Sequence, residues 1–148
     1  MMRQLLDPRI PEGLHGALLS LLRIVTGTAF MQHGVQKLFG LLLPPDQPWN
    51  GAPAALSQMW FGGVLEVFGG ALIVLGLFTR PVAFLLSGMM AVAYFQAHFP
   101  RGFWPVLNGG ESAVLFCFIY LYIFAAGPGP YSVDAALFGK RRTERDAG

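Results

Sequence analysis

Long apolar runs alternate with short polar or proline-rich segments along this chain. Each run approaches or exceeds the roughly 20 apolar residues that a membrane-spanning helix needs: they are Leu14–Leu43, Leu56–Phe78, Pro81–Phe99 and Gly110–Ala126. The last run is short, so it spans only where the bilayer is thin. The pattern therefore predicts an all-α fold, an integral membrane four-helix bundle in which residues 1–148 form a single domain.

The segments between the runs indicate how the helices are joined. Pro81 can occupy the first turn of a helix, so a tight turn at Thr79 and Arg80 would make the second and third helices an antiparallel hairpin. After the fourth run, residues 127–131 break the helix with two glycines and two prolines. We expect Ser132 to cap a short amphipathic segment over Val133–Phe138, followed by a flexible Gly139–Gly148.

Composition and charge narrow the class of protein. Of the 148 residues, 54% are hydrophobic and 12% are charged, against about 25% charged in soluble domains. The formal charge of the chain is +2, and its basic residues concentrate just past the last apolar run, which favours a topology signal beside anionic lipid over nucleic-acid binding. The single cysteine, Cys117, excludes an intramolecular disulfide and a Cys-x-x-Cys pair. Its apolar surroundings indicate an unreactive thiol.

The distribution of Lys and Arg predicts the topology. One side of the membrane would carry most of them, namely Arg3, Arg9, Arg80, Lys140, Arg141, Arg142 and Arg145. The other side would carry only Arg101 and Lys37. By the positive-inside rule both termini are cytoplasmic, and the loops 44–53 and 100–108 face outward. We expect the first run to stay as a helix, because Arg23 interrupts it and no clean signal-peptidase site follows.

One carboxylate, Glu66, lies in the middle of an apolar run between two glycine pairs. An ionisable residue at a bilayer centre costs at least about 2.5 kcal/mol, so it usually faces protein, water or a ligand. With the predicted topology, further ionisable groups share its outer half of the bundle: His33, Lys37, His98 and Glu111. Arg23 lies deeper, on a helix face with Gly27 and Gly34 that would allow close packing.

These residues admit structural as well as functional interpretations. Glu66 is either a proton carrier or ligand contact, or the partner of Arg23 in an ion pair that fixes helix register. Asn108 and Glu111 have the spacing of a capping box, and His33, Lys37 and His98 can simply reach the interface. His33 and His98 are the one pair that suits a haem, but no metal-ligand spacing accompanies them, so no haem or metal is predicted.

Several short motifs occur in order along nearly the whole chain. They are Arg23 with His33-Gly34-x-x-Lys37-Leu38, Gly63-x-x-Glu66-x-x-Gly69-Gly70, Gly76-x-x-Thr79-Arg80, Asn108-Gly109-Gly110-Glu111 and Gly127-Pro128-Gly129-x-Tyr131-Ser132-x-Asp134. In these motifs the chain resembles the DoxX family of four-helix bacterial membrane proteins. The resemblance implies a multi-pass protein of the bacterial cytoplasmic (inner) membrane.

The family takes its name from a small membrane subunit of a thiosulfate:quinone oxidoreductase. The resemblance therefore implies a quinone-interacting component of a membrane oxidoreductase system, with quinone as its cofactor and a soluble or membrane redox protein as partner. Because we find no soluble domain that would bind thiosulfate, we do not expect the sulfur substrate. Fold carries over within a family more readily than reaction does, and the sequence leaves open whether the chain is itself an enzyme.

In the quinone hypothesis, Glu66 and Glu111 exchange protons as the catalytic residues. The ligand-binding residues are Arg23, His33, Lys37, His98 and Asn108. The alternative is a non-catalytic anchor for a soluble redox partner, or a binder or carrier of a small lipophilic molecule. An ion channel is disfavoured, since no helix carries a polar residue on every turn. The expected partners are the lipid bilayer, a redox protein and a second copy of the chain, and no nucleic acid.

Overall fold

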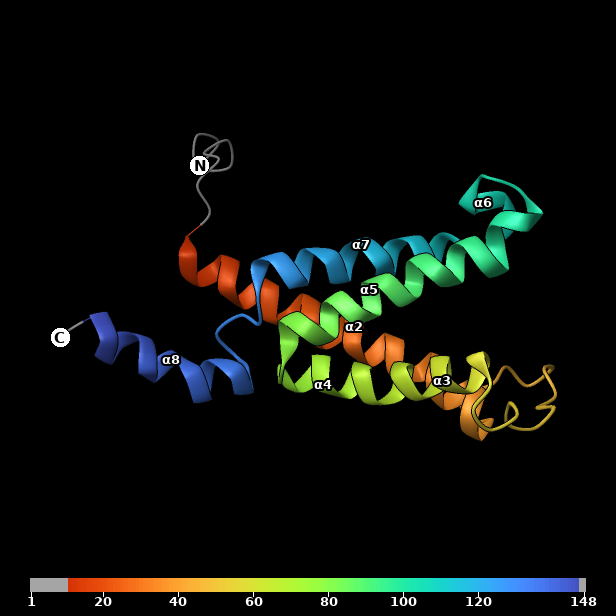
Figure 1. The fold of residues 1–148 in the computed structure, drawn as a ribbon, viewed down its shortest axis with the longest axis horizontal. Helices are drawn as coiled ribbons and strands as arrows, with labels where there is room; N and C mark the ends of the chain where they lie inside the picture. The colour runs from red at the N-terminus through yellow and green to blue at the C-terminus, as the bar shows by residue number, and fades with distance from the viewer. Residues whose placement is uncertain (1–10, 147–148) are drawn as a thin grey trace.

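A computed structural model describes residues 11–146, with side chains described up to residue 139. This part of the chain is helical and contains no β-strand, which confirms the all-α prediction (Figure 1). The elements are α2 (Glu12–Phe39), α3 (Gln58–Val64), the π-helix η1 (Leu65–Gly69), α4 (Gly70–Leu75), α5 (Thr79–Ala93), the π-helix η2 (Tyr94–His98), the 3₁₀ helix η3 (Phe99–Arg101), α6 (Pro105–Asn108), α7 (Glu111–Ala126) and α8 (Val133–Asp146).

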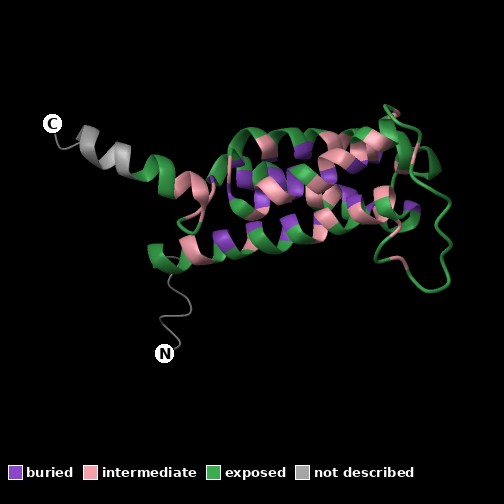
Figure 2. Cartoon of the chain, turned by 90° about the horizontal axis from the view of Figure 1, so that it is seen from below, coloured by how far each residue is buried: buried purple, intermediate pink, exposed green. Residues whose placement is uncertain are grey.

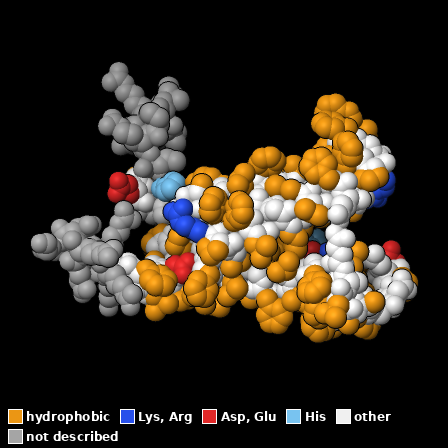
Figure 3. Space-filling view, viewed as in Figure 1, with side chains coloured by type: hydrophobic (Ala, Val, Ile, Leu, Met, Phe, Trp, Pro, Cys, Tyr) orange, Lys and Arg blue, Asp and Glu red, His pale blue; other side chains and the backbone are white. Residues whose placement is uncertain are grey.

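Within the described residues, three helices are long and apolar enough to cross a membrane: Glu12–Phe39, Gln58–Leu75 and Thr79–Arg101. The fourth apolar helix, α7, has 16 residues, or about 24 Å at 1.5 Å per residue. Hydrophobic side chains cover the flank of the bundle in Figure 3, and Lys and Arg side chains lie at its two ends. The chain is thus a membrane protein built as a helical bundle.

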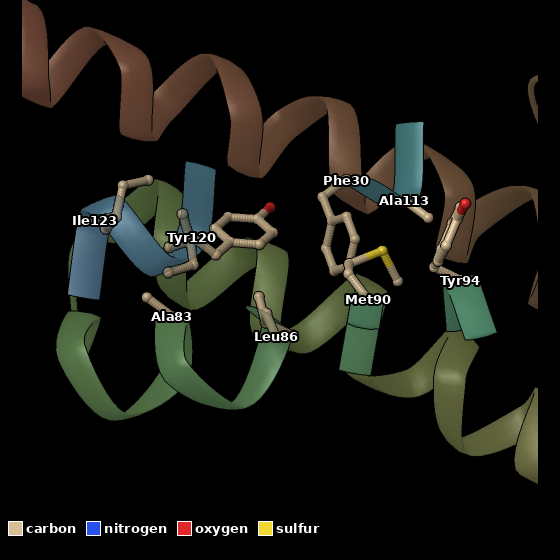
Figure 4. Packing of buried hydrophobic residues seen from close by; sticks show 9 residues of the cluster. Phe30, Ala83, Leu86, Met90, Tyr94, Ala113, Tyr120 and Ile123 are labelled. Carbon is tan, nitrogen blue, oxygen red and sulfur yellow. The ribbon is translucent and has the colours of Figure 1, made fainter. Parts of the chain in front are cut away.

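The bundle consists of two antiparallel helix pairs. The continuous helix α3–η1–α4 packs along α2, and α5 packs along α7. Buried residues face the interior between the pairs (Figure 2). In Figure 4, Phe30 of α2 lies beside Met90 of α5, with Tyr120 and Ile123 of α7 farther along the same core. Phe30 and Tyr120 meet edge to face, with ring centroids 5.1 Å apart.

Glycines bring α2 unusually close to its partner helix. A Cβ on Gly34 would lie 2.7 Å from the carbonyl oxygen of Gly63, and one on Gly70 would lie 2.9 Å from that of Gly27. Real Cβ atoms do not approach so closely, so these positions accept only glycine without movement of the backbone. The close approach predicted for the Arg23 face of the first helix is confirmed.

The first two spans end at glycines rather than at the ends of their apolar runs. α2 ends at Phe39 instead of Leu43, because Gly40 takes a left-handed φ of 64° and its N–H closes onto the carbonyl of Gln36. The second span ends at Leu75 instead of Phe78, where Gly76 has a φ of 67°. At the other end of that span, Ser57 caps the helix by accepting a hydrogen bond from the N–H of Trp60.

The turn between the second and third spans is tied to the C-terminal segment. α5 begins at Thr79, two residues before the predicted start, and Pro81 lies in its first turn as predicted. The carboxylate of Asp134 accepts hydrogen bonds from the N–H groups of Phe78 at 2.9 Å and Thr79 at 2.8 Å. Asp134 therefore supplies the N-terminal cap of α5 from a distant part of the chain.

The C-terminal helix is longer than the sequence suggested. Ser132 caps it as predicted, through a hydrogen bond of 3.1 Å from the N–H of Ala135 to its hydroxyl. The helix then continues to Asp146, so the expectation of a segment ending at Phe138 was wrong, and residues 139–146 of the expected flexible tail are helical. Residues 147–148 of that tail lie outside the described residues. The reason is local, because Lys, Arg and Glu favour helix. The basic side chains from Lys140 onward, like Arg3 and Arg9, lie outside the described residues.

Candidate functional site

A partly open cavity of about 200 Å³ lies among the four apolar helices. Every span contributes side chains to it. Its polar lining residues come from α2, η1, η2 and α7, and its apolar ones mainly from α2, α5 and α7. The lining residues are Phe30, His33, Lys37, Glu66, Met90, Ala93, His98, Ser112, Ala113 and Phe116.

The polar part of the cavity is dominated by an ion pair. Nζ of Lys37 lies 2.5 Å from Oε1 of Glu66. The Glu66 side chain is only 3% exposed, whereas that of Lys37 is 37% exposed and reaches toward the surface. The second carboxylate oxygen, Oε2, is buried and has no hydrogen-bond partner among the described residues. Buried polar atoms normally have such a partner.

Two π-helical segments deliver polar side chains to this cavity. Glu66 lies in η1 and His98 lies in η2, and in each case ordinary α-helix precedes the π segment. A π turn adds a residue to the turn and so changes which face of the helix the following side chains occupy. Such turns inside α-helices occur frequently at functional sites. Apolar periodicity gives no signal of them, so the sequence did not predict either one.

His98 is held by the loop that follows its helix. Its Nδ1 lies 3.3 Å from the carbonyl oxygen of Asn108, to which it donates in one tautomer, and 3.1 Å from Nη2 of Arg101, from which it accepts in the other. Either contact leaves Nε2 for a ligand. The buried side chain of Asn108 in turn fixes the loop, donating to the carbonyl of Gly102 at 2.7 Å and accepting from the N–H of Gly110 at 2.8 Å. Asn108 thus positions His98 and does not itself line the cavity.

The exposed lining residues indicate that the mouth of the cavity lies between α2 and α7. Two lining residues are exposed, His33 of α2 and Ser112 of α7, and these two helices pack against each other only slightly. The rings of His33 and Phe116 meet edge to face across the mouth, with centroids 6.0 Å apart. A molecule that enters here comes from the flank of the bundle rather than from its ends.

The structure brings four of the candidate residues together and separates the others. His33, Lys37, Glu66 and His98 all line the cavity, although their chemical roles stay predictions. Glu111 is exposed in the first turn of α7 and does not line it. The capping-box prediction was wrong, because Gly110 is the N-cap residue and the Asn108 side chain bonds to the N–H of Gly110 instead.

Arg23 is not the partner of Glu66. It lies roughly 20 Å along α2 from Lys37, given about 1.5 Å per residue, and its side chain is wholly buried. Its guanidinium donates to the carbonyls of Pro128 at 2.9 Å, Val74 at 2.5 Å and Tyr131 at 2.5 Å, and also to that of Ile73. Arg23 therefore joins the end of α4 to the segment after α7, and a ligand in the cavity does not reach it.

The lining residues that the sequence did not indicate are mostly apolar. Phe30, Met90, Ala93, Ala113 and Phe116 have no feature that separates them from other core or lipid-facing residues. No group of three or more His, Cys, Asp or Glu side chains that could hold a metal ion occurs in the described part of the chain. The cavity thus combines apolar walls with one charged pair and two imidazoles, an arrangement that suits a small amphipathic molecule.

Comparison with known proteins gives a consistent assignment. The DoxX family profile matches residues 18–99, which include His33, Lys37, Glu66 and His98. An uncharacterized protein of Haemophilus influenzae is 38% identical over 125 residues, covering 82% of this chain and 92% of that protein. An uncharacterized membrane protein of Mycobacterium tuberculosis is 29% identical over 138 residues, covering 82% of each. No solved structure gives a significant match. On these similarities the chain belongs to the DoxX family of membrane proteins.

Proposed function

We propose that this chain is a quinone-interacting component of a membrane oxidoreductase system, which holds the quinone ring in the cavity beside Glu66. The observation that carries the proposal is a buried carboxylate with one oxygen paired to Lys37 and the other unpartnered, inside a cavity with apolar walls. Intramembrane ionisable residues usually mark pathways of substrates, ions or protons.

The size and position of the cavity support a ring with a lipid-soluble tail. Pockets for whole drug-sized ligands occupy about 300–1,000 Å³, so the roughly 200 Å³ here suits a single ring. The mouth between α2 and α7 would let the isoprenoid tail remain among the lipid chains. The aromatic rings of Phe30 and Phe116, whose centroids are 5.1 Å apart, would line one side of the bound ring.

The polar groups supply the contacts that a quinone requires. An imidazole of His33 or His98, or the ammonium of Lys37, donates a hydrogen bond to a carbonyl oxygen, and Glu66 exchanges the proton that accompanies reduction. Reduction of a quinone to a quinol takes up two electrons and two protons. In this proposal a partner redox protein supplies the electrons, and the chain supplies the binding site and the route for protons.

The proposed setting is the bacterial cytoplasmic (inner) membrane, with both termini in the cytoplasm. In Figure 1 the start of α2 and helix α8 lie at one end of the bundle, and α6 and the loop between α2 and α3 lie at the other. In the sequence, most Lys and Arg residues precede α2 or belong to α8, which supports a cytoplasmic placement for the first end. The ion pair then lies in the outer half of the membrane.

The test is to identify what the purified protein binds. Lipids extracted from the protein in detergent are analysed by mass spectrometry, and a short-chain quinone is titrated against wild type and two variants. Ala93 lines the cavity and Ala97, one turn later, is exposed, so Ala93→Phe fills the site and Ala97→Phe is its matched control. We expect co-purified quinone and a binding loss confined to Ala93→Phe. No quinone and no titration in wild type would refute the proposal.

A further inference from the structure

His98 offers the cavity a polar atom that an occupant can reach. Among the residues of the described chain that are not exposed, the only buried side-chain N or O atoms without a hydrogen-bond partner are Oε2 of Glu66 and Oγ1 of Thr79. Nε2 of His98 also lacks such a partner there, since the hydrogen bonds of the ring are made by Nδ1. Nε2 is therefore not buried. Because His98 lines the cavity, this nitrogen is open to a bound molecule.

What Nε2 offers to that molecule is decided at the other ring nitrogen. A neutral imidazole carries one proton, so one nitrogen donates and the other accepts. If Nδ1 donates to the carbonyl oxygen of Asn108, at 3.3 Å, Nε2 presents a lone pair. If Nδ1 instead accepts from Nη2 of Arg101, at 3.1 Å, Nε2 carries the hydrogen and is a donor. The two contacts exclude each other, so Arg101 and Asn108 compete for the tautomer of the ring.

The contact with Arg101 favours the tautomer in which Nε2 is the donor. It is the shorter of the two contacts, and hydrogen bonds with an ionised partner are stronger than those between neutral groups. Nη2 has two N–H groups, so Arg101 can hold the ring while it also donates to the carbonyl of Ala97 at 3.1 Å. Because Arg101 is exposed, its replacement should not disturb the fold.

We infer that Arg101 is a positioning residue, which acts through His98 and lets the cavity bind the oxidised, quinone form of its ligand. The inference rests on the proposed function and assigns one contact of that ligand. A quinone carbonyl only accepts hydrogen bonds, so it needs the hydrogen on Nε2 and hence the tautomer that Arg101 stabilises. A quinol hydroxyl both donates and accepts, so it can bind either tautomer. Binding of the quinone therefore depends on Arg101, and binding of the quinol does not.

The expected effect is the strength of one neutral hydrogen bond. Without Arg101, Nδ1 should donate to the carbonyl of Asn108, and a bound quinone would require the ring to give up that bond. Such a bond changes a binding constant by about fivefold. Arg101→Met replaces the guanidinium with an apolar side chain that has no donor. Its matched control is Arg80→Met, because Arg80 is likewise exposed and donates to helix carbonyls but does not line the cavity.

The experiment measures a short-chain, fully ring-substituted 1,4-benzoquinone and its quinol by calorimetry under anaerobic conditions, with the protein in lipid nanodiscs. The proteins are wild type, Arg101→Met, Arg80→Met, His98→Leu and the double variant of Arg101→Met with His98→Leu. We expect Arg101→Met to bind the quinone about fivefold more weakly than wild type does, and the quinol equally well. Arg80→Met should match wild type. In the His98→Leu background, loss of Arg101 should have no further effect on either ligand.

Nitrogen NMR on protein with isotope-labelled histidine reads the tautomer directly. The spectra are recorded above the pH range in which histidine takes up a second proton. Nε2 of His98 should give the signal of a protonated nitrogen in wild type and that of an unprotonated nitrogen in Arg101→Met. The chain has three histidines, so variants that lack each one in turn assign the signals. An unprotonated Nε2 in wild type would overturn the inference, even if Arg101→Met does not fold.

The outcomes separate this inference from the proposed function. If Arg101→Met weakens both ligands alike or neither of them, or acts equally in the His98→Leu background, the inference is wrong while the proposed function stands. A wild-type protein that binds the quinol alone would also overturn the inference. If wild type binds neither ligand, both the inference and the proposed function are wrong.

Discussion

Nζ of Lys37 lies 2.5 Å from Oε1 of Glu66, which joins the last turn of α2 to the π-helical turn of the second span. The pair is unequal, because the carboxylate is buried and the ammonium is 37% exposed. The lysine can reach water without its partner, whereas the glutamate cannot. Because of this asymmetry, stability measurements on variants of each residue can separate the structural role of the ion pair from its role in ligand binding.

Removal of Lys37 should cost more stability than removal of Glu66. Lys37→Met leaves a buried carboxylate without a cation, and we expect a loss of roughly 2 kcal/mol in the free energy of unfolding. Glu66→Met leaves a lysine that can turn to the surface, so its loss should be smaller. The double variant should lose less than the sum of the two. Unfolding in mixed detergent micelles measures all three, and additive losses would show that the pair does not interact.

Arg23 should be the most sensitive charged residue for stability. Arg23→Leu leaves buried carbonyls at the end of α4 and after α7 without their donor, and should lower the free energy of unfolding by about 3 kcal/mol or more. The matched control is Arg80→Leu. Arg80 also donates to two carbonyls, those of Phe124 and Ala125, but it is exposed, so its loss should stay below about 1 kcal/mol. Equal losses for the two variants would contradict the role given to Arg23.

The glycine contact between α2 and the second span should tolerate no added methyl group. In Gly34→Ala the new Cβ would meet the backbone of Gly63, and we expect a loss of about 1–3 kcal/mol from the forced separation of the helices. A Cβ on Gly88 of α5 meets nothing within 4 Å, so Gly88→Ala should be neutral or slightly stabilising. Equal losses in the free energy of unfolding for the two variants would contradict the close contact assigned to Gly34.

The sequence predicted the framework of this protein better than its polar contacts. Four apolar runs and the glycines near Glu66 gave the all-α bundle and the close helix pair, because hydrophobic length and small-residue spacing are local properties. The predicted topology also placed His33, Lys37, Glu66 and His98 in the same part of the bundle. Which of them touch depends on side-chain reach and on helix phase, and the two π turns alter that phase.

Arg23 and Asn108 show why the remaining contacts were not predictable. Charges inside a membrane commonly pair with other charges, so an ion pair between Arg23 and Glu66 was one of the interpretations that the sequence left open. Arg23 instead binds backbone carbonyls, which every residue carries and no pattern marks. Asn108 and Glu111 matched a capping box in spacing, but the left-handed Gly109 separates α6 from α7 and moves Asn108 out of the cap position.

The proposed topology predicts where reporter domains fold. A reporter that is active only in the periplasm should be inactive at the C-terminus and active in the loop 44–53. A reporter active only in the cytoplasm should give the opposite pattern. The expectation follows from the Lys and Arg residues that in the sequence precede α2 or belong to α8. Periplasmic activity at the C-terminus would place the ion pair in the inner half of the membrane instead.

Photolabelling shows whether a quinone-like ring binds among the four helices beside Glu66. An azido-quinone is irradiated with the protein in nanodiscs, and the labelled peptides are identified by mass spectrometry. We expect labels on cavity residues of α2 and α7, such as His33 and Phe116. Unlabelled quinol should compete for them, and Ala93→Phe should abolish them. Labels that spread over the lipid-facing helix surfaces and do not respond to the competitor would show that no such site exists beside Glu66.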